Sequence, residues 1–181
     1  MVDEVQTGMG RTGAWFAHQH NDIVPDVMTL AKGLGNGVPI GACLARGKAA
    51  AILSPGTHGS TFGGNPLVSR AALATIDAIE SDSLTDRATL IGDAITEGLR
   101  TNFNNENSVI DIRNKGLMIG IELDRSCLSI VDYALEAGLL LNVTADKVIR
   151  LLPPLILDDE QIKLLIISLT DVIKQFLQES K

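Results

Sequence analysis

Apolar residues follow two kinds of spacing along the chain, one typical of helices and the other typical of strands. Residues 84–99 carry apolar side chains every three or four positions, which predicts an amphipathic helix. Residues 162–176 show the same spacing and predict a last helix that starts at Asp158. By contrast, apolar side chains alternate over residues 117–123, so this segment is predicted to be a strand that follows a turn at Gly116.

The first part of the chain is rich in glycine and contains two short apolar runs. The runs at 27–31 and 40–45 are bounded by turn residues and indicate buried strands. Asn65 and Pro66 predict the start of a helix, because asparagine caps helix N-termini and proline suits the first helical position. The expected packing face of this helix consists of Leu67, Val68, Ala71, Ala72, Thr75, Ile76 and Ile79.

The second part of the chain alternates between helix and strand patterns. Residues 83–86 resemble a capping box and predict a helix start. Strands are predicted at 109–113, 139–142 and 148–152, with a short helix that ends at Gly138.

This order of elements, without repeats or low-complexity tracts, predicts an α/β or mixed α/β layer architecture. We expect a domain boundary near residues 81–83. It divides the chain into a glycine-rich region, 1–82, and a smaller layer of strands and helices, 83–181.

The composition excludes several classes of function. Of the 181 residues, 45% are hydrophobic, which is enough for a well-filled core. The 22 acidic and 15 basic residues give a net charge of −7, which disfavours nucleic acid as a partner. No apolar run approaches about 18 residues and the N-terminus lacks a signal-peptide pattern, so we expect a cytoplasmic protein that is not embedded in a membrane. Cys43 and Cys127 lie in apolar runs and are expected to fill the core.

Lys32 lies between an apolar run and a glycine-rich loop. A buried lysine has a lowered pKa and becomes a nucleophilic amine, whereas the alternative is a solvated lysine at the start of the loop. Upstream, Asp3 ends a strand-like start, and its alternative role is that of a surface acid. A pyridoxal phosphate site needs a carboxylate at the pyridine nitrogen and a lysine at the aldehyde. Asp3 and Lys32 supply these two groups if the strand ends at which they lie come together.

Two other patterns are weaker. Residues 8–13 match GxGxxG, but they follow acidic residues and precede a poor helix start, so a dinucleotide site is not expected. His18 and His20 lack a carboxylate or cysteine at a supporting spacing, and His58 belongs to a glycine-rich turn. We therefore propose no metal site.

Four segments resemble the class III pyridoxal-phosphate-dependent aminotransferases, in the order in which that family carries them. They are DEVQTGMGRTG at 3–13, PDVMTLAKGLGNGVPIGA at 25–42, HGSTFGGNPL at 58–67 and VIRLLPPL at 148–155. Agreement over four separate segments is far more specific than any single one. Gln6, together with the GRTG that follows it, favours the ornithine-type group over the aminomutase branch.

The resemblance implies a fragment of the fold-type I transferase fold. Residues 1–82 would be the C-terminal part of the large, mostly parallel-sheet domain, and 83–181 the small α+β domain. The implied enzyme is a homodimer of arginine biosynthesis that moves the terminal amino group of N-acetylornithine, or of a close ornithine-type donor, to 2-oxoglutarate through lysine-bound pyridoxal 5'-phosphate. Relatives that use ornithine, succinylornithine or 4-aminobutyrate share these motifs and are the alternatives.

Individual roles follow from the same resemblance. Lys32 matches the lysine that binds the cofactor covalently and then acts as general base. Asp3 matches the aspartate that keeps the pyridine nitrogen protonated. Val5 matches the apolar residue on one face of the ring, and Gln6 matches the amide that hydrogen-bonds its phenolic oxygen.

Two further matches concern the phosphate and the substrate. Ser60 and Thr61 match the segment whose threonine hydroxyl reaches the cofactor phosphate of the neighbouring subunit, although a Ser-Thr pair among glycines is otherwise a turn. Arg150 matches the arginine that binds the substrate α-carboxylate, and its alternative role is a structural salt bridge.

The family's upstream half, with its glycine-rich phosphate loop, has no counterpart in the sequence, and Met1 to Gln6 resembles the end of a strand. We therefore expect a C-terminal half that is inactive by itself. Two other functions stay open from the residues alone: an oxidoreductase with a dinucleotide-binding domain, and a non-catalytic oligomerising fragment.

Overall fold

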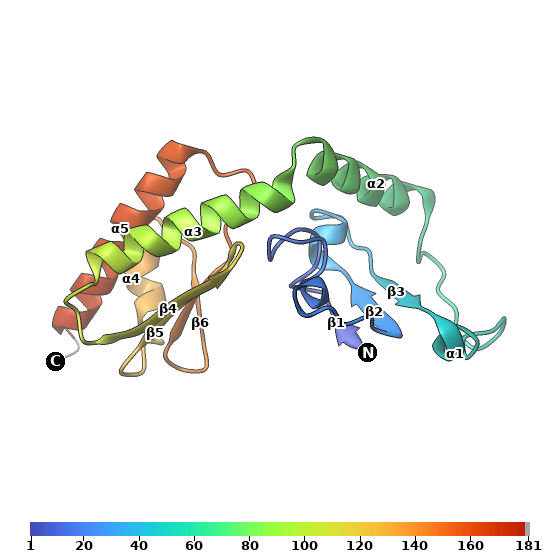
Figure 1. Cartoon of the computed structure of the whole chain (residues 1–181), viewed down its shortest axis with the longest axis horizontal. Helices are drawn as coiled ribbons and strands as arrows, with labels where there is room; N and C mark the ends of the chain where they lie inside the picture. The colour runs from blue at the N-terminus through green and yellow to red at the C-terminus, as the bar shows by residue number, and fades with distance from the viewer. Residues whose placement is uncertain (180–181) are drawn as a thin grey trace. The chain divides into compact units, whose positions relative to one another are not determined.

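The computed structural model describes residues 1–179. The chain forms two compact units, residues 1–86 and residues 87 onward, and Figure 1 labels most of their elements. Each unit has its own sheet and its own helices, which confirms the predicted mixed α/β content. No helix within the described residues is both long and apolar enough to cross a membrane.

The first unit is built on a three-stranded sheet with the order β1-β2-β3. Strand β1 (Val2–Asp3) is parallel to β2 (Val27–Leu30), and β3 (Ala42–Ala45) is antiparallel to β2. The two apolar runs predicted as buried strands form β2 and β3, although pairing in β3 starts later than the run. Burial is confirmed for Met28 and Leu30 of β2 but is wrong for β3, which has no buried residue. Three short helical segments connect these elements. Segment η1 (Ala17–Asn21) lies between β1 and β2, η2 (Lys32–Leu34) lies between β2 and β3, and α1 (Gly47–Ala50) follows β3.

Helix α2 (Pro66–Ser81) starts where the sequence predicts. The side-chain oxygen of Asn65 accepts hydrogen bonds from the backbone N–H groups of Leu67 and Val68, at 3.1 and 3.2 Å. Leu67 does not belong to the packing face, since its side chain is 75% exposed. Three residues of the predicted face are buried: Val68, Ala72 and Ile79.

Substitution of this cap should weaken the first unit. We expect Asn65→Ala to lower the free energy of unfolding by about 1 kcal/mol, because two N–H groups at the start of α2 lose their acceptor. Urea denaturation followed by circular dichroism measures the change. Asn65→Asp keeps an acceptor oxygen and is the matched control; an equal loss in both variants would contradict the capping role.

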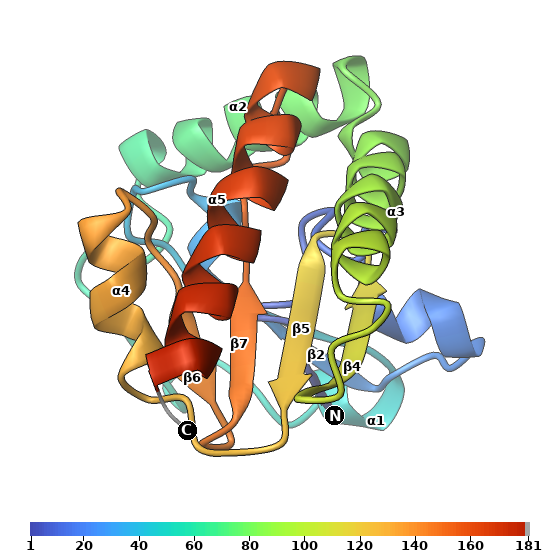
Figure 2. The same cartoon turned by 90° about the vertical axis from the view of Figure 1, so that its left-hand side faces the viewer.

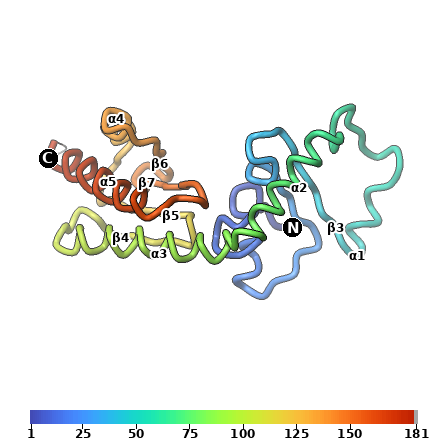
Figure 3. The backbone as a smooth tube through the Cα atoms, turned by 90° about the horizontal axis from the view of Figure 1, so that it is seen from above, coloured from blue at the N-terminus to red at the C-terminus, as the bar shows by residue number. Residues whose placement is uncertain are grey.

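The second unit contains a four-stranded antiparallel sheet with the order β4-β5-β7-β6. Helices α3 and α5 lie across one face of this sheet, and α4 lies beside α5 (Figure 2). Figure 3 shows the path of the backbone through the same elements. Their bounds are α3 (Leu84–Asn102), β4 (Val109–Lys115), β5 (Met118–Leu123), α4 (Ile130–Glu136), β6 (Asn142–Thr144), β7 (Val148–Leu151) and α5 (Asp159–Glu179).

The predicted apolar stripes form the core of this unit. Ile95 and Leu99 of α3 and Ile173 of α5 are completely buried. They pack with Ile121 and Ile149 from the two central strands, which are equally inaccessible. The core therefore lies between one face of the sheet and the two long helices.

A tight contact joins α3 to the hairpin of β4 and β5. The turn predicted at Gly116 is confirmed, with a φ of 53° that favours glycine. A Cβ atom on Gly92 of α3 would lie 2.0 Å from the carbonyl oxygen of Gly116, so only glycine fits at position 92.

Helix starts show one success and one error of sequence interpretation. At the start of α5, Asp158 Oδ1 accepts a hydrogen bond from the N–H of Gln161, and Gln161 Oε1 accepts one from the N–H of Asp158. Helix α3 begins at Leu84 as expected, but the capping box predicted at 83–86 is wrong. Ser83 has a φ of 51°, and within residues 1–179 its side chain makes no hydrogen bond.

Two further predictions are wrong. Strand pairing begins at Asn142 rather than Leu139. Leu139 and Leu141 pack against the core without joining the ladder, and Leu140 between them is exposed. Cys43 lies exposed on β3 and does not fill the core.

Cys127 is buried as expected, and burial together with the charge of Asp146 raises the pKa of its thiol to about 11.

Candidate functional site

The parallel strands β1 and β2 bring both candidate catalytic residues to one edge of the sheet. Asp3 is the last residue of β1 and lies opposite Thr29 of β2. Lys32 follows shortly after the end of β2 and begins η2. Because the carboxyl ends of parallel strands share an edge, the predicted meeting of the two strand ends is confirmed.

The carboxylate of Asp3 is held through one of its oxygens. Its Oδ1 accepts hydrogen bonds from the N–H of Val5 at 2.9 Å and from the hydroxyl of Thr29 at 3.3 Å. Within the described part of the chain, Oδ2 has no partner. Asp3 is exposed, so this second oxygen is accessible to a ligand.

Lys32 is exposed, so of the two alternatives that the sequence left open the structure shows the solvated lysine at the start of the loop. Its backbone adopts a left-handed conformation with a φ of 44°, which turns the chain at the end of β2. The neighbouring Leu30 and Leu34 are buried and fill the apolar layer in its place. The amine of Lys32 has no hydrogen-bond or ion-pair partner among residues 1–179.

Val5 and Gln6 lie in the turn that follows Asp3, and both are partly buried. The N–H of Gly8 donates to the carbonyl of Glu4 at 3.0 Å and closes this turn. A Cβ atom at position 8 would lie 2.8 Å from that carbonyl oxygen, so the turn requires a glycine there. The roles of Val5 and Gln6 toward a cofactor ring stay predictions.

Glu4 is a feature that sequence reasoning missed. It stands in the sequence between two candidate cofactor-binding residues, Asp3 and Val5, and its side chain is almost completely buried. Burial alone would raise the pKa of Glu4, but hydrogen bonds from Thr7, from the backbone N–H groups of His18 and Ala17, and from the His18 ring lower this pKa below its ordinary value. The signal in the sequence is an acidic residue at the start of a glycine-rich segment.

The GxGxxG segment and the histidines have structural partners. Residues 8–13 form turns with positive φ at Met9 and two glycines, and no α-helix starts there. The ring of His20 lies 3.0 Å from the carbonyl oxygen of Thr12. Among residues 1–179, no cluster of three or more metal-binding side chains is present.

Ser60 and Thr61 lie in an exposed loop before α2. The hydroxyl of Ser60 accepts a hydrogen bond from the N–H of Gly63 at 2.8 Å, so this serine stabilises a turn. The Thr61 hydroxyl has no partner within residues 1–179. Its contact with the phosphate of a neighbouring subunit stays a prediction.

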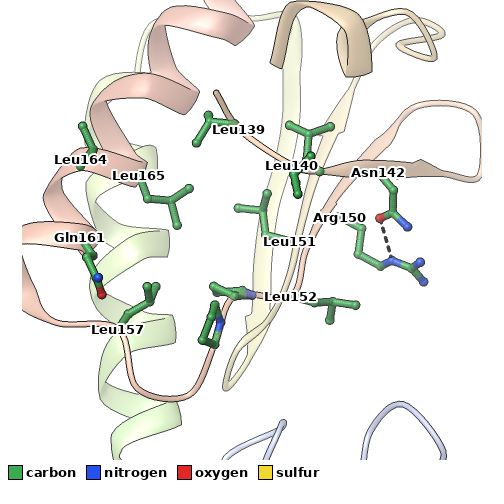
Figure 4. A pocket seen from close by; sticks show the side chains of 13 residues that line it. Leu139, Leu140, Asn142, Arg150, Leu151, Leu152, Leu157, Gln161, Leu164 and Leu165 are labelled. Carbon is green, nitrogen blue, oxygen red and sulfur yellow. Dashed lines mark hydrogen bonds between the residues drawn. The ribbon is translucent and has the colours of Figure 1, made fainter. Parts of the chain in front are cut away.

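Arg150 lies on β7 in the second unit and is partly buried. Its Nε donates a hydrogen bond to Oδ1 of Asn142 on the neighbouring strand β6, at 3.1 Å (Figure 4). Both side chains border an open pocket of about 600 Å³ whose wall is mostly leucine. The charged guanidinium thus lies next to a mostly apolar wall, and its contact with a substrate carboxylate stays a prediction.

Comparisons with known proteins identify the family. A sequence model of the family "Aminotransferase class-III" matches residues 1–173. The chain belongs to the class III aminotransferases. It is 54% identical, over all of its length, to acetylornithine aminotransferase 1 of Bordetella pertussis, and it spans 46% of that relative.

Solved structures of class III aminotransferases agree with this fold. An ornithine aminotransferase of Toxoplasma gondii matches with a TM-score of 0.91 and 34% identity, over 98% of this chain and 43% of that one. An N-acetylornithine aminotransferase of Stenotrophomonas maltophilia K279a matches with a TM-score of 0.86 and 34% identity, over 98% of this chain and 47% of that one. The predicted transferase fold is thus confirmed as a partial fold.

Class III aminotransferases use pyridoxal phosphate, and the Toxoplasma structure is described with this cofactor at its active site. The edge formed by β1 and β2 fits such a cofactor. A pyridine nitrogen needs a carboxylate oxygen, which Asp3 Oδ2 offers, and an aldehyde needs an amine, which Lys32 offers. Family membership also rules out the oxidoreductase alternative.

Proposed function

We propose that this chain carries the catalytic lysine and the pyridine-binding aspartate of an aminotransferase that acts on N-acetylornithine and 2-oxoglutarate. The observation that carries this proposal is the position of Asp3 and Lys32 at one edge of a parallel strand pair, each with an unpaired group among residues 1–179. The curated relatives named acetylornithine aminotransferase support the choice of amino donor.

The proposal includes a larger assembly. The chain spans about half the length of the curated relatives it matches, so we propose that it acts as the C-terminal half of the enzyme. The upstream half would supply the phosphate-binding loop, and a homodimer would place Thr61 at the neighbouring subunit's phosphate. We refer below to this assembly as the complete enzyme.

Asp3, Lys32 and Arg150 each have a different role in the proposed amino transfer. When bound, pyridoxal phosphate supplies a ring that withdraws electrons from the substrate carbon that bears the amine. Asp3 holds a proton on the pyridine nitrogen through its charge, which favours this withdrawal. The Nζ of Lys32 would take the proton from the substrate carbon that bears the amine, as general base, and deliver it to the cofactor carbon, as general acid. Arg150 holds the substrate by its α-carboxylate, with Asn142 fixing one edge of the guanidinium.

The amino donor is tested by the rate of glutamate formation. The complete enzyme should transfer the amino group of N-acetylornithine to 2-oxoglutarate with a higher kcat/KM than that of ornithine, succinylornithine or 4-aminobutyrate. A higher kcat/KM for another donor would change the substrate assignment but keep the reaction. No transfer from any of the four donors would favour the non-catalytic oligomerising fragment.

Arg150 is tested by substrate affinity. We expect Arg150→Ala to raise the KM for 2-oxoglutarate about 10- to 100-fold, because a charged hydrogen bond to the carboxylate is lost. Cofactor absorbance should stay unchanged, since the arginine is assigned to the substrate. Arg125→Ala is the control, because its guanidinium pairs with Asp124 in a different loop. An unchanged KM in Arg150→Ala would mean that the arginine is structural.

A further inference from the structure

Glu4 has every polar group of its backbone and side chain engaged, although it lies between two residues that we assign to the cofactor. Its N–H donates to the carbonyl of Thr29 at 3.0 Å, and its own carbonyl accepts from Gly8. The side chain is 3% exposed. A carboxylate this deeply buried needs several hydrogen-bond donors to offset the loss of hydration.

Four donors surround the two carboxylate oxygens. Oε1 accepts from the backbone N–H of His18 at 2.9 Å and lies 3.2 Å from Nδ1 of the same residue. Oε2 accepts from the N–H of Ala17 at 3.0 Å and from the hydroxyl of Thr7. Glu4 thus ties the end of β1 to the start of η1 and to its own following turn.

These contacts constrain the residues on both sides of Glu4. A rotation of the Asp3 backbone would move the Glu4 N–H away from the carbonyl oxygen of Thr29. The side-chain hydroxyl of Thr29 also donates a hydrogen bond to Asp3 Oδ1. On the other side, the Val5 N–H bonds to that same Oδ1. The direction of the unpaired Asp3 oxygen therefore depends on backbone that the buried Glu4 carboxylate anchors.

We propose that Glu4 is a positioning residue of the cofactor site, which acts through Asp3 and Val5 and does not itself touch the cofactor. This inference rests on the proposed function, since it assumes that Asp3 binds the pyridine nitrogen. Small displacements of reacting groups lower enzymatic rates strongly, so a residue that fixes Asp3 affects the reaction from outside the site.

The test uses Glu4→Gln in the complete enzyme. An amide nitrogen in place of one oxygen must face the N–H of either Ala17 or His18, so at least one partly buried N–H loses its acceptor. We expect kcat per bound cofactor to fall about 10- to 100-fold. We also expect the visible circular dichroism of the bound cofactor to change, because its ring is held at a different angle.

Glu80→Gln is the matched control. It makes the same chemical change on the exposed surface of α2 in the same unit, and both readouts should keep their wild-type values. Thr7→Val removes one hydrogen bond and keeps the charge, so it should shift both readouts in the same direction as Glu4→Gln but less. Thr7→Val also provides the test if Glu4→Gln does not fold.

The outcomes separate this inference from the proposed function. Borohydride labelling of Lys32 in the wild-type enzyme establishes the cofactor site independently of Glu4. If Lys32 is labelled but the Glu4 and Thr7 variants have wild-type kcat and visible circular dichroism per bound cofactor, the positioning role is wrong, even where their thermal stability is lower. If Lys32 is not labelled, the proposed function fails first.

Discussion

Replacement of Lys32 by alanine is expected to abolish covalent binding of pyridoxal phosphate and to slow amino transfer by about 10⁴-fold or more, because nucleophile and general base are lost together. The structure places this amine at the carboxyl edge of β1 and β2 without a partner among residues 1–179. Borohydride reduction of the wild-type complete enzyme, followed by peptide mapping, should locate the cofactor on Lys32. The variant should carry no label.

Lys48→Ala is the control for this experiment. Lys48 is also an exposed lysine in the first unit, but it lies on α1, away from the end of β2 in the sequence. Its substitution should leave both the label and the rate unchanged. Label on Lys48 or Lys147 in the wild-type enzyme would contradict the assignment of Lys32.

The sequence predicted the elements that carry the site because their local signals agree with their packing. The run that became β2 is short, apolar and bounded by turn residues, and the Asn65 cap marks the start of α2. The stripe at 84–99 is buried against the sheet of the second unit. In each case the hydrophobic period and the local chemistry indicate the same structure.

The errors arise where long-range packing decides the outcome. The apolar neighbours of Lys32 left both a buried and a solvated lysine open, and the structure combines a left-handed turn at Lys32 with burial of Leu30 and Leu34 in its place. The Glu4 network joins residues more than ten positions apart, and no local pattern specifies such a contact. The bond between Arg150 and Asn142 likewise depends on the register of β6 and β7, because a shift of one residue would place the two side chains on opposite faces of the sheet.

Replacement of Asp3 by asparagine should slow amino transfer about 100- to 1000-fold while cofactor binding to Lys32 is retained, since a charge is lost at the ring nitrogen and nowhere else. The asparagine oxygen can still accept from Val5 and Thr29, as Asp3 Oδ1 does. Its amide nitrogen then takes the place of Oδ2, and a neutral amide does not hold a proton on the pyridine ring.

Three measurements on the complete enzyme decide this prediction. Borohydride labelling of Lys32 should be unchanged in Asp3→Asn, and kcat should fall although the KM for 2-oxoglutarate stays close to wild type. Asp26→Asn removes the same charge from an exposed residue just before β2 and should have a wild-type kcat. A wild-type kcat in Asp3→Asn as well would show that its carboxylate only stabilises the start of the Val5 turn and that another group protonates the pyridine nitrogen.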